Sequence, residues 1–242
     1  MDSTSNRSLQ SYIQEGIVIV ASILVAFAID AFWARYQESR VEERILLELH
    51  DEFESSRERI LGSIAELDRS LSASATLLNH LGPATADLSR EAAEDLLGEI
   101  LWGNTLEVPS SVLDSTVASG QLRLITNNRL RKALSDWPSL VADVRENHDW
   151  HRQATDEAFV PYIAKFIAVR TAVVSSGYLE SNRSTFNLDP APLQRDPVFE
   201  GLLSWRASRQ FATHLDSTVL LSAASEVLVM IEHELDLDLD SS

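Results

Sequence analysis

The chain has 242 residues, of which 45% are hydrophobic and 24% charged, and this composition excludes a disordered or collagen-like protein. Its 20 Lys and Arg against 37 Asp and Glu give a net charge of −17, so nucleic acid is excluded as an expected partner, because an acidic surface repels phosphate. Eight Gly and seven Pro are too few for the many tight turns of an all-β protein, and without Cys there is no disulfide or thiolate metal site. We therefore expect an all-α protein.

The first predicted element is a transmembrane helix over residues 16–36, which follows a short N-terminal tail of residues 1–15. Asp30 is the one ionisable side chain in residues 16–34, and this length matches the hydrocarbon core at a rise of about 1.5 Å per residue. Trp33 stands where aromatic residues meet the membrane interface. A cleaved signal peptide and a buried core helix stay open as alternatives, although Arg7 alone supplies the positive charge that a signal peptide needs.

Small and polar residues follow one side of this predicted helix. Glu15, Ser22, Ala26 and Asp30 share that side, and small residues let helices approach closely in lipid. We therefore expect a homo-oligomer. Two roles remain open for Asp30: an interfacial carboxylate beside Trp33, or part of an acidic path for cations through the oligomer.

The charges that flank the predicted span bear on its orientation. Arg35, Arg40 and Arg44 follow the span closely, whereas Arg7 stands alone before it, and this favours a cytoplasmic C-terminal domain. The difference is small, so the side of the membrane on which the domain lies stays open. The expected location is a bacterial inner membrane, with the lipid bilayer as a partner.

Residues 37–82 are predicted to form a long, charged, coiled-coil-like helix. Its apolar residues recur at a seven-residue spacing on two seams, one with Phe53, Ile60, Leu67 and Leu81 and the other with Ile64, Leu71 and Leu78. Arg57 and Ser74 interrupt the seams. Packing within the protein's own bundle and packing against a second copy are therefore equal alternatives. Pro83 should end the helix, because proline cannot continue the hydrogen-bond ladder.

A helical bundle is predicted for residues 83–235, before an acidic tail of residues 236–242. Its helices are expected at residues 90–102, 111–119, 129–136, 138–159 and 163–174, and the last helix starts at Asp196 and Pro197. Ser111 and Asp114 resemble a capping box, and residues 177–197 read as a surface loop. The last helix should bury an apolar stripe that contains Phe199, Leu202, Leu203, Phe211, Leu215, Val219, Leu220, Leu228 and Ile231.

No catalytic signature is present in the sequence. It has no HExxH, no GxSxG and no phosphate-binding Gly-rich loop, and no cofactor is predicted. His148 and His151 share a helix face, with Asp156 nearby, and these three residues are the candidate metal ligands. Two histidines do not fill a coordination shell, so hydrogen bonding between helices is the competing interpretation.

Two segments resemble a widespread family of uncharacterised bacterial membrane proteins. The first runs from Glu15 through the apolar stretch to Asp30 and Trp33 and continues as RYQESRVEER over residues 35–44; the second is SGQLRLI at residues 119–125. Family members have a single N-terminal span that starts with Glu and ends with Asp or Asn near Trp. The resemblance implies a membrane-anchored helical protein, and the family has no established activity to carry over.

The sequence thus predicts a single-pass, oligomeric, membrane-anchored helical protein that acts in sensing, scaffolding or interaction, without catalytic activity. The alternative is a membrane-anchored metal-dependent enzyme that uses His148, His151 and Asp156. The residues do not identify a protein partner.

Overall fold

The computed structural model describes residues 5–101, 106–177 and 179–236, with side chains from Val20 onward. Helices account for every regular element in these ranges, so the predicted all-α class is confirmed for the described part of the chain. In chain order the elements are α1 (Ser5–Leu78), α2 (Arg90–Leu101), α3 (Ser111–Ala118), η1 (Gln121–Leu124), α4 (Asn128–Ala154), η2 (Thr155–Phe159), α5 (Val160–Ile163), α6 (Val169–Ser175), η3 (Ala191–Arg195) and α7 (Pro197–Glu234).

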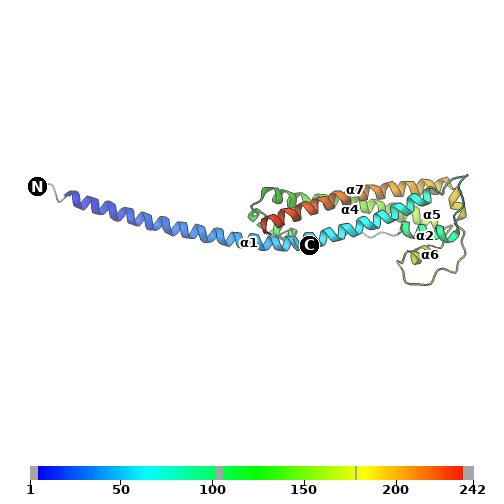
Figure 1. Cartoon of the computed structure of the whole chain (residues 1–242), viewed down its shortest axis with the longest axis horizontal. Helices are drawn as coiled ribbons and strands as arrows, with labels where there is room; N and C mark the ends of the chain where they lie inside the picture. Colours follow the sequence, from blue (N-terminus) through cyan, green and yellow to red (C-terminus); the bar gives the residue numbers. More distant parts are fainter. Residues whose placement is uncertain (1–4, 102–105, 178, 237–242) are drawn as a thin grey trace.

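Helix α1 joins the predicted membrane span and the predicted coiled-coil-like segment into one uninterrupted helix. Its 74 residues correspond to about 110 Å at 1.5 Å per residue. The first part projects away from the rest of the molecule, and the second part lies within a bundle (Figure 1). The helix ends at Leu78, close to the predicted end, and Gly82 follows with a φ of 125° that favours glycine.

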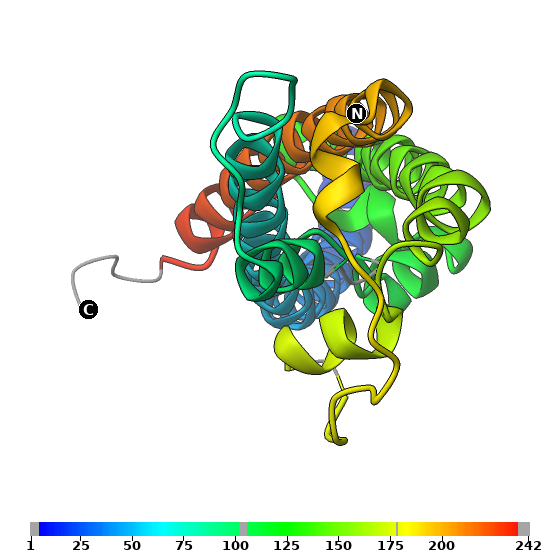
Figure 2. The same ribbon diagram turned by 90° about the vertical axis from the view of Figure 1, so that its right-hand side faces the viewer.

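The bundle is built on α1, α4 and α7, with α7 antiparallel to the other two (Figure 1). We call the end where α1 enters the bundle the proximal end; α3 and the last turns of α7 lie there. The opposite, distal end carries α2, α5 and α6, which lie beside the ends of the long helices, with α6 at the bottom of the view along the bundle (Figure 2). The coiled-coil-like spacing of α1 therefore serves packing against α7 within the same chain.

Pro138 lies inside helix α4 and not at the start of a separate helix, as the sequence predicted. We expected a helix over residues 129–136 and a second one starting at Pro138, but α4 is continuous and holds Pro138 in its interior. Proline removes one ladder hydrogen bond; the helix survives because Leu134, Trp137 and Val144 are buried in the core on either side. The predicted start is confirmed, since the Asn127 side chain accepts hydrogen bonds from the next helical amides.

The segment after α4 also differs from the prediction. A π-helical turn, η2, separates α4 from the short α5, and residues 164–168 are not helical, so the predicted helix over residues 163–174 is wrong in its first part. Of the predicted loop at residues 177–197, Gly177 and residues 179–196 are irregular except for η3, and residue 178 lies outside the described residues. Pro197 is the first residue of α7, which Asp196 caps as expected. Trp102 and residues 237–242 of the predicted tail lie outside the described residues.

The N-terminus of α3 is capped by a carboxylate from α1 and not by the local capping box that the sequence predicted. The N-cap residue is Ser110, whose hydroxyl binds Asp114 and leaves the helix amides without a local acceptor. The buried Glu52 carboxylate accepts from the Val112 and Leu113 amides at 2.7 and 3.0 Å and from the Ser111 hydroxyl. The negative charge also suits a helix N-terminus. The predicted capping box is therefore replaced by a tertiary contact between α1 and α3.

Two apolar clusters form the core. The proximal cluster centres on Leu49, Phe53 and Ile60 of α1, and the distal cluster on Leu97, Phe159 and Phe199. Between them lies a layer that is mostly polar, and its buried polar members are Ser63, Ser70, His148, Arg206, Gln210, Thr213 and Ser217. We refer to these seven residues as the polar layer.

The polar layer explains an error in the predicted buried stripe of α7. Phe199, Leu203, Leu220, Leu228 and Ile231 are buried as expected, but Phe211, Leu215 and Val219 are 52, 50 and 57% exposed. Helix α7 is continuous over 38 residues, so the packing of its two ends determines which face its middle presents to the core. In the middle of α7 that inward face carries polar residues, so the apolar residues there point outward.

Candidate functional site

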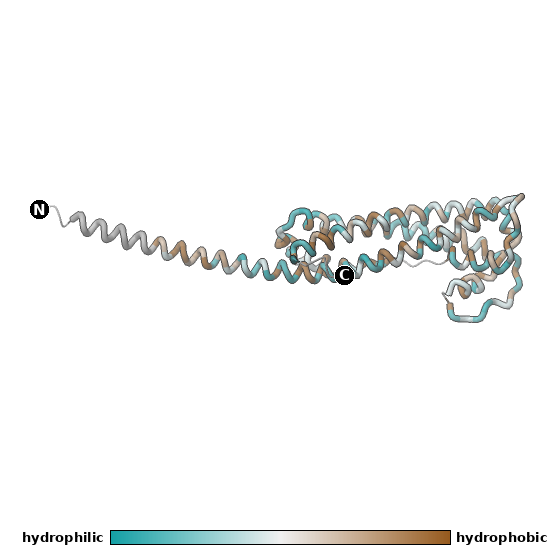
Figure 3. The backbone as a smooth tube through the Cα atoms, in the orientation of Figure 1, coloured by the Kyte–Doolittle hydropathy of each residue, from teal (hydrophilic) through white to brown (hydrophobic). Residues whose placement is uncertain are grey.

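The most unusual surface of the molecule is the projecting part of α1. Every side chain from residue 20 to residue 40 is exposed, and η1 lies beside only the last part of this stretch, where Arg123 and Leu124 share a shallow pocket with Arg35, Glu38 and Ser39. Its large apolar residues range from 49 to 71% exposed: Val20, Ile23, Leu24, Val25, Phe27, Ile29, Phe32, Trp33 and Tyr36. Figure 3 shows this apolar section before the helix becomes polar towards the bundle. A contiguous apolar surface of this size marks a site of interaction with a membrane or a protein.

The predicted site residues of the span fall within α1. Ser22, Ala26 and Asp30 are exposed and follow one another at intervals of four residues, so they share one side of the helix. The Trp33 ring lies 5.9 Å from the Tyr36 ring. Glu15 belongs to the same helix, but its side chain lies outside the described residues.

One helix among the described residues is long and apolar enough to cross a membrane, and that helix is α7 rather than the predicted N-terminal segment. A third of the apolar window of α7 is buried inside the bundle, where it packs against α1 and α4. A core helix of a bundle meets the same length and composition criterion. The predicted N-terminal span is described with side chains only from Val20 onward.

The candidate ligands His148, His151 and Asp156 do not converge on one point. His148 is buried and His151 half-buried, and the Nε2 atom of each ring is buried without a hydrogen-bond partner among the described residues. Asp156 is exposed and lines an open groove of about 660 Å³ on the outer side of α4, together with Asp149, Trp150 and residues near them. The structure therefore places His148 in the polar layer with His151 beside it, and it separates Asp156 from both histidines.

Arg206 lies at the centre of the polar layer. Its guanidinium donates to the Thr155 hydroxyl and to the Gln210 side-chain oxygen, at 3.1 Å each, and to the backbone carbonyl of Ile100. It also lies 5.6 Å from the centre of the Phe159 ring, and no ion pair between described residues includes it. Burial lowers the pKa of Arg206 to about 10. Its polar partners satisfy hydrogen bonds without neutralising its charge.

The same layer keeps the two histidines neutral. Burial, followed by the positive charge of Arg206 and the proximity of His148, lowers the pKa of His151 to about 3. Burial also lowers the pKa of His148, with Asp149 opposing that effect. Neutral imidazoles fit a site next to an unneutralised guanidinium, because a second positive charge there would be repelled.

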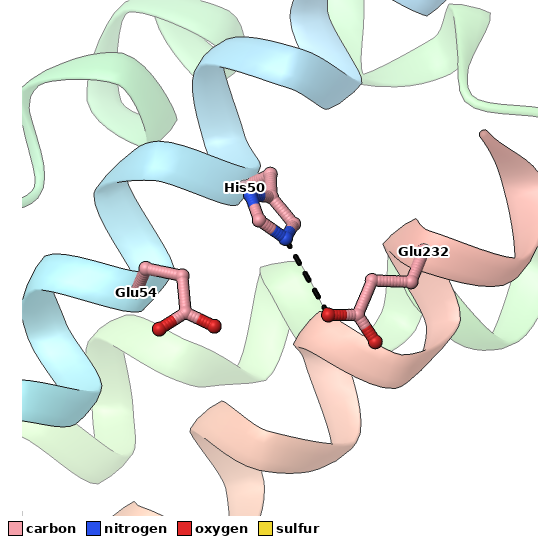
Figure 4. A group of neighbouring side chains, drawn as sticks. All are labelled: His50, Glu54 and Glu232. Atoms are coloured by element: carbon pink, nitrogen blue, oxygen red, sulfur yellow. Dashed lines mark ion pairs between the residues drawn. The ribbon is translucent and has the colours of Figure 1, made fainter. Parts of the chain in front are cut away.

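A different group of side chains converges at the proximal end. Ligand-type atoms of His50 and Glu54 on α1 and of Glu232 on α7 all lie within 4.8 Å of one another, and they form the one such group of three found among the described residues. The His50 Nε2 atom faces a Glu232 carboxylate oxygen at 3.5 Å (Figure 4). On the other side of the ring, Nδ1 lies 3.8 Å from Asp51. Glu54 also pairs with Arg57 at 2.8 Å.

Two of the three residues of this proximal group could have been found in the sequence. His50 and Glu54 are four residues apart in a predicted helix, which places them on the same face. Glu232 lies 182 positions beyond His50 in the chain numbering, and only the antiparallel packing of α1 and α7 brings them together.

Comparison with protein-family models, with curated proteins and with solved structures gave no match for this chain. Function is therefore inferred from the geometry described above.

Proposed function

We propose that this protein is a membrane-anchored, oligomeric interaction or sensing module of a bacterial inner membrane, with the N-terminal part of α1 as its anchor. The observation that carries the proposal is the exposed apolar section of α1, which no other described residue buries. In water this surface costs about 25 cal/mol for each Å² of apolar area, whereas lipid removes that cost. The resemblance to single-pass membrane proteins supports the same reading.

The continuity of α1 suits a coupling role. The anchor and the bundle share one helix without a described break, so a displacement of the anchor is transmitted to the core positions Leu49 and Phe53. A flexible linker would absorb such a displacement. A single rigid helix that links a membrane to a helical domain is a feature expected of a sensing or scaffolding protein rather than of an enzyme.

The proposed partner of the bundle is a second copy of the chain. Trp205, Phe211, Leu215 and Val219 form an exposed apolar stripe on α7, with exposed fractions of 50 to 61%. Anchors in one bilayer hold all copies in the same orientation, so identical stripes can meet around a two-fold axis. The small side of the anchor, with Ser22 and Ala26, would let the membrane helices approach in the same arrangement.

Anchoring is tested by introducing two charges into the apolar section. The double variant Leu24→Arg with Phe27→Arg should leave the membrane, since each Arg near the centre of a span costs about 3 kcal/mol. Carbonate extraction of cell membranes, followed by immunoblotting of pellet and supernatant, measures the change. The wild-type chain should remain in the pellet.

A matched control places the same two charges on exposed apolar positions of the bundle. Leu61→Arg with Val117→Arg, at positions 48 and 49% exposed, should stay in the pellet with the wild type. Full-length wild-type protein in the supernatant would contradict the anchor. A soluble product with an N-terminus near Ile29 would instead identify a cleaved signal peptide.

Self-association is tested on the α7 stripe. Leu215→Glu should lower the cross-linked dimer fraction in membranes about fivefold, because two buried carboxylates would face each other across the two-fold axis. Leu61→Glu, on α1 and equally exposed, is the matched control and should cross-link as the wild type does. Equal loss in both variants, or a wild type that does not cross-link, would rule out the stripe as the interface.

A further inference from the structure

We propose that His50, Glu54 and Glu232 bind one divalent transition-metal cation, with Zn²⁺ as the ion that the ligand set fits best. This inference goes beyond the proposed membrane function and does not depend on it, because the three residues belong to the described bundle.

The distances among the side chains match a common coordination centre. Two ligands on a tetrahedral ion, each about 2.0 to 2.1 Å from the metal, lie a little over 3 Å apart. His50 Nε2 and the nearer Glu232 oxygen are 3.5 Å apart, and the third ligand atom lies within 4.8 Å of both. Small rotations of the half-buried Glu54 and Glu232 side chains bring all three ligand atoms into range. Three protein ligands would leave a fourth position for water or for another ligand.

The charge and chemistry of the group favour a divalent cation. With the imidazole in the neutral form that binds a metal, the three side chains carry a charge of −2, which Arg57 beside Glu54 reduces to −1. No Lys or Arg forms an ion pair with Glu232 among the described residues. An imidazole ligand favours Zn²⁺ over Mg²⁺ or Ca²⁺, which prefer oxygen ligands. Asp51 lies 3.8 Å from the other ring nitrogen, beyond hydrogen-bond distance, so it adds negative charge near the site without fixing the ring.

The residues that hold the ligands are rigidly packed. Each ligand directly follows a buried apolar residue: His50 follows Leu49, Glu54 follows Phe53 and Glu232 follows Ile231. These three apolar side chains are at most 1% exposed. Such packing preorganises the ligand positions before a metal arrives. Arg57 holds one oxygen of Glu54, and a single remaining oxygen suffices for a monodentate ligand.

The location indicates what the metal would do. The ligands connect α1 to the last turn of α7 at the proximal end, just after α1 enters the bundle. A bound ion would therefore fasten the C-terminal end of α7 to the helix that carries the anchor. Metal availability would then set how firmly the bundle holds that helix.

The test is isothermal titration of ZnCl₂ into the metal-stripped full chain in detergent micelles. We expect one Zn²⁺ per chain and an increase in Tm on binding. His50→Ala and Glu232→Gln should each weaken binding at least about tenfold, because each removes one of three ligands. MgCl₂ in place of ZnCl₂ should give no comparable heat.

His233→Asn is the matched control, since this exposed histidine adjoins Glu232 but is not part of the group. It should bind Zn²⁺ as the wild type does. Circular dichroism establishes that His50→Ala and Glu232→Gln remain folded. The absence of saturable binding, or equal affinity in wild type and Glu232→Gln, would overturn the site. Neither result would affect the extraction experiment, so failure of the metal site and failure of the anchor are distinguishable.

Discussion

Replacement of Gly98 by Ala should lower the free energy of unfolding of the bundle by about 3 kcal/mol. This is the upper end of the range typical of substitutions that overpack a core. Gly98 is buried in α2 against α6, and a Cβ atom added there would lie 2.4 Å from the carbonyl oxygen of Ala172 and 3.4 Å from the amide nitrogen of Ser176. That oxygen already accepts the Ser176 amide at 3.1 Å, so it belongs to the hydrogen-bonded end of α6. Backbone cannot move aside as a side chain can, and α2 must separate from α6.

Gly62→Ala is the matched control within the same molecule. Gly62 is exposed in α1 and has no atom within 4 Å of an added Cβ, so the variant should gain up to about 1 kcal/mol from helix propensity. Urea unfolding of the full chain in detergent, followed by circular dichroism, measures both effects. Destabilisation of similar size in both variants would contradict the close approach of α2 and α6.

Protonation of His151 should destabilise the fold in acid: we expect the free energy of unfolding to fall by about 2 kcal/mol between pH 7 and pH 5. In the folded protein the pKa of His151 is about 3, below the ordinary histidine value of 6.5, so the unfolded chain binds the proton more readily. The stabilisation is therefore complete above about pH 6.5 and is lost as the pH falls towards 3. Each unit between the two pKa values corresponds to about 1.36 kcal/mol. His148, with its lowered pKa, acts in the same direction.

His151→Gln isolates this effect from the titration of the carboxylates. The variant keeps a polar side chain but cannot take up a proton, so its stability should fall about 2 kcal/mol less than that of the wild type from pH 7 to pH 5. Urea unfolding at several pH values provides the comparison. His233→Gln, an exposed histidine outside the polar layer, should follow the wild-type profile. A wild-type profile in His151→Gln would mean that His151 is solvated in the folded protein.

Local sequence determined the features that depend on neighbouring residues alone. Asn127 and Asp196 cap α4 and α7 because an Asn or Asp side chain reaches the amides of its own helix. The long run without Gly or Pro before Gly62 predicted the helix that α1 contains. Composition was enough for the all-α class, because few residues suited to turns were present.

Tertiary structure decided the features that depend on residues distant in the chain. Gly62 and Gly98 are alike in sequence as glycines within helices, yet only Gly98 meets another backbone. The cap of α3 comes from Glu52, and Pro138 stays within α4 because the core holds both sides of it. Phe211, Leu215 and Val219 in the middle of α7 face outward, because the packing of the two ends of the helix determines which face its middle presents to the core. His50 meets Glu232 only through antiparallel packing, because the spacing of residues along one helix carries no information about which other helix lies opposite.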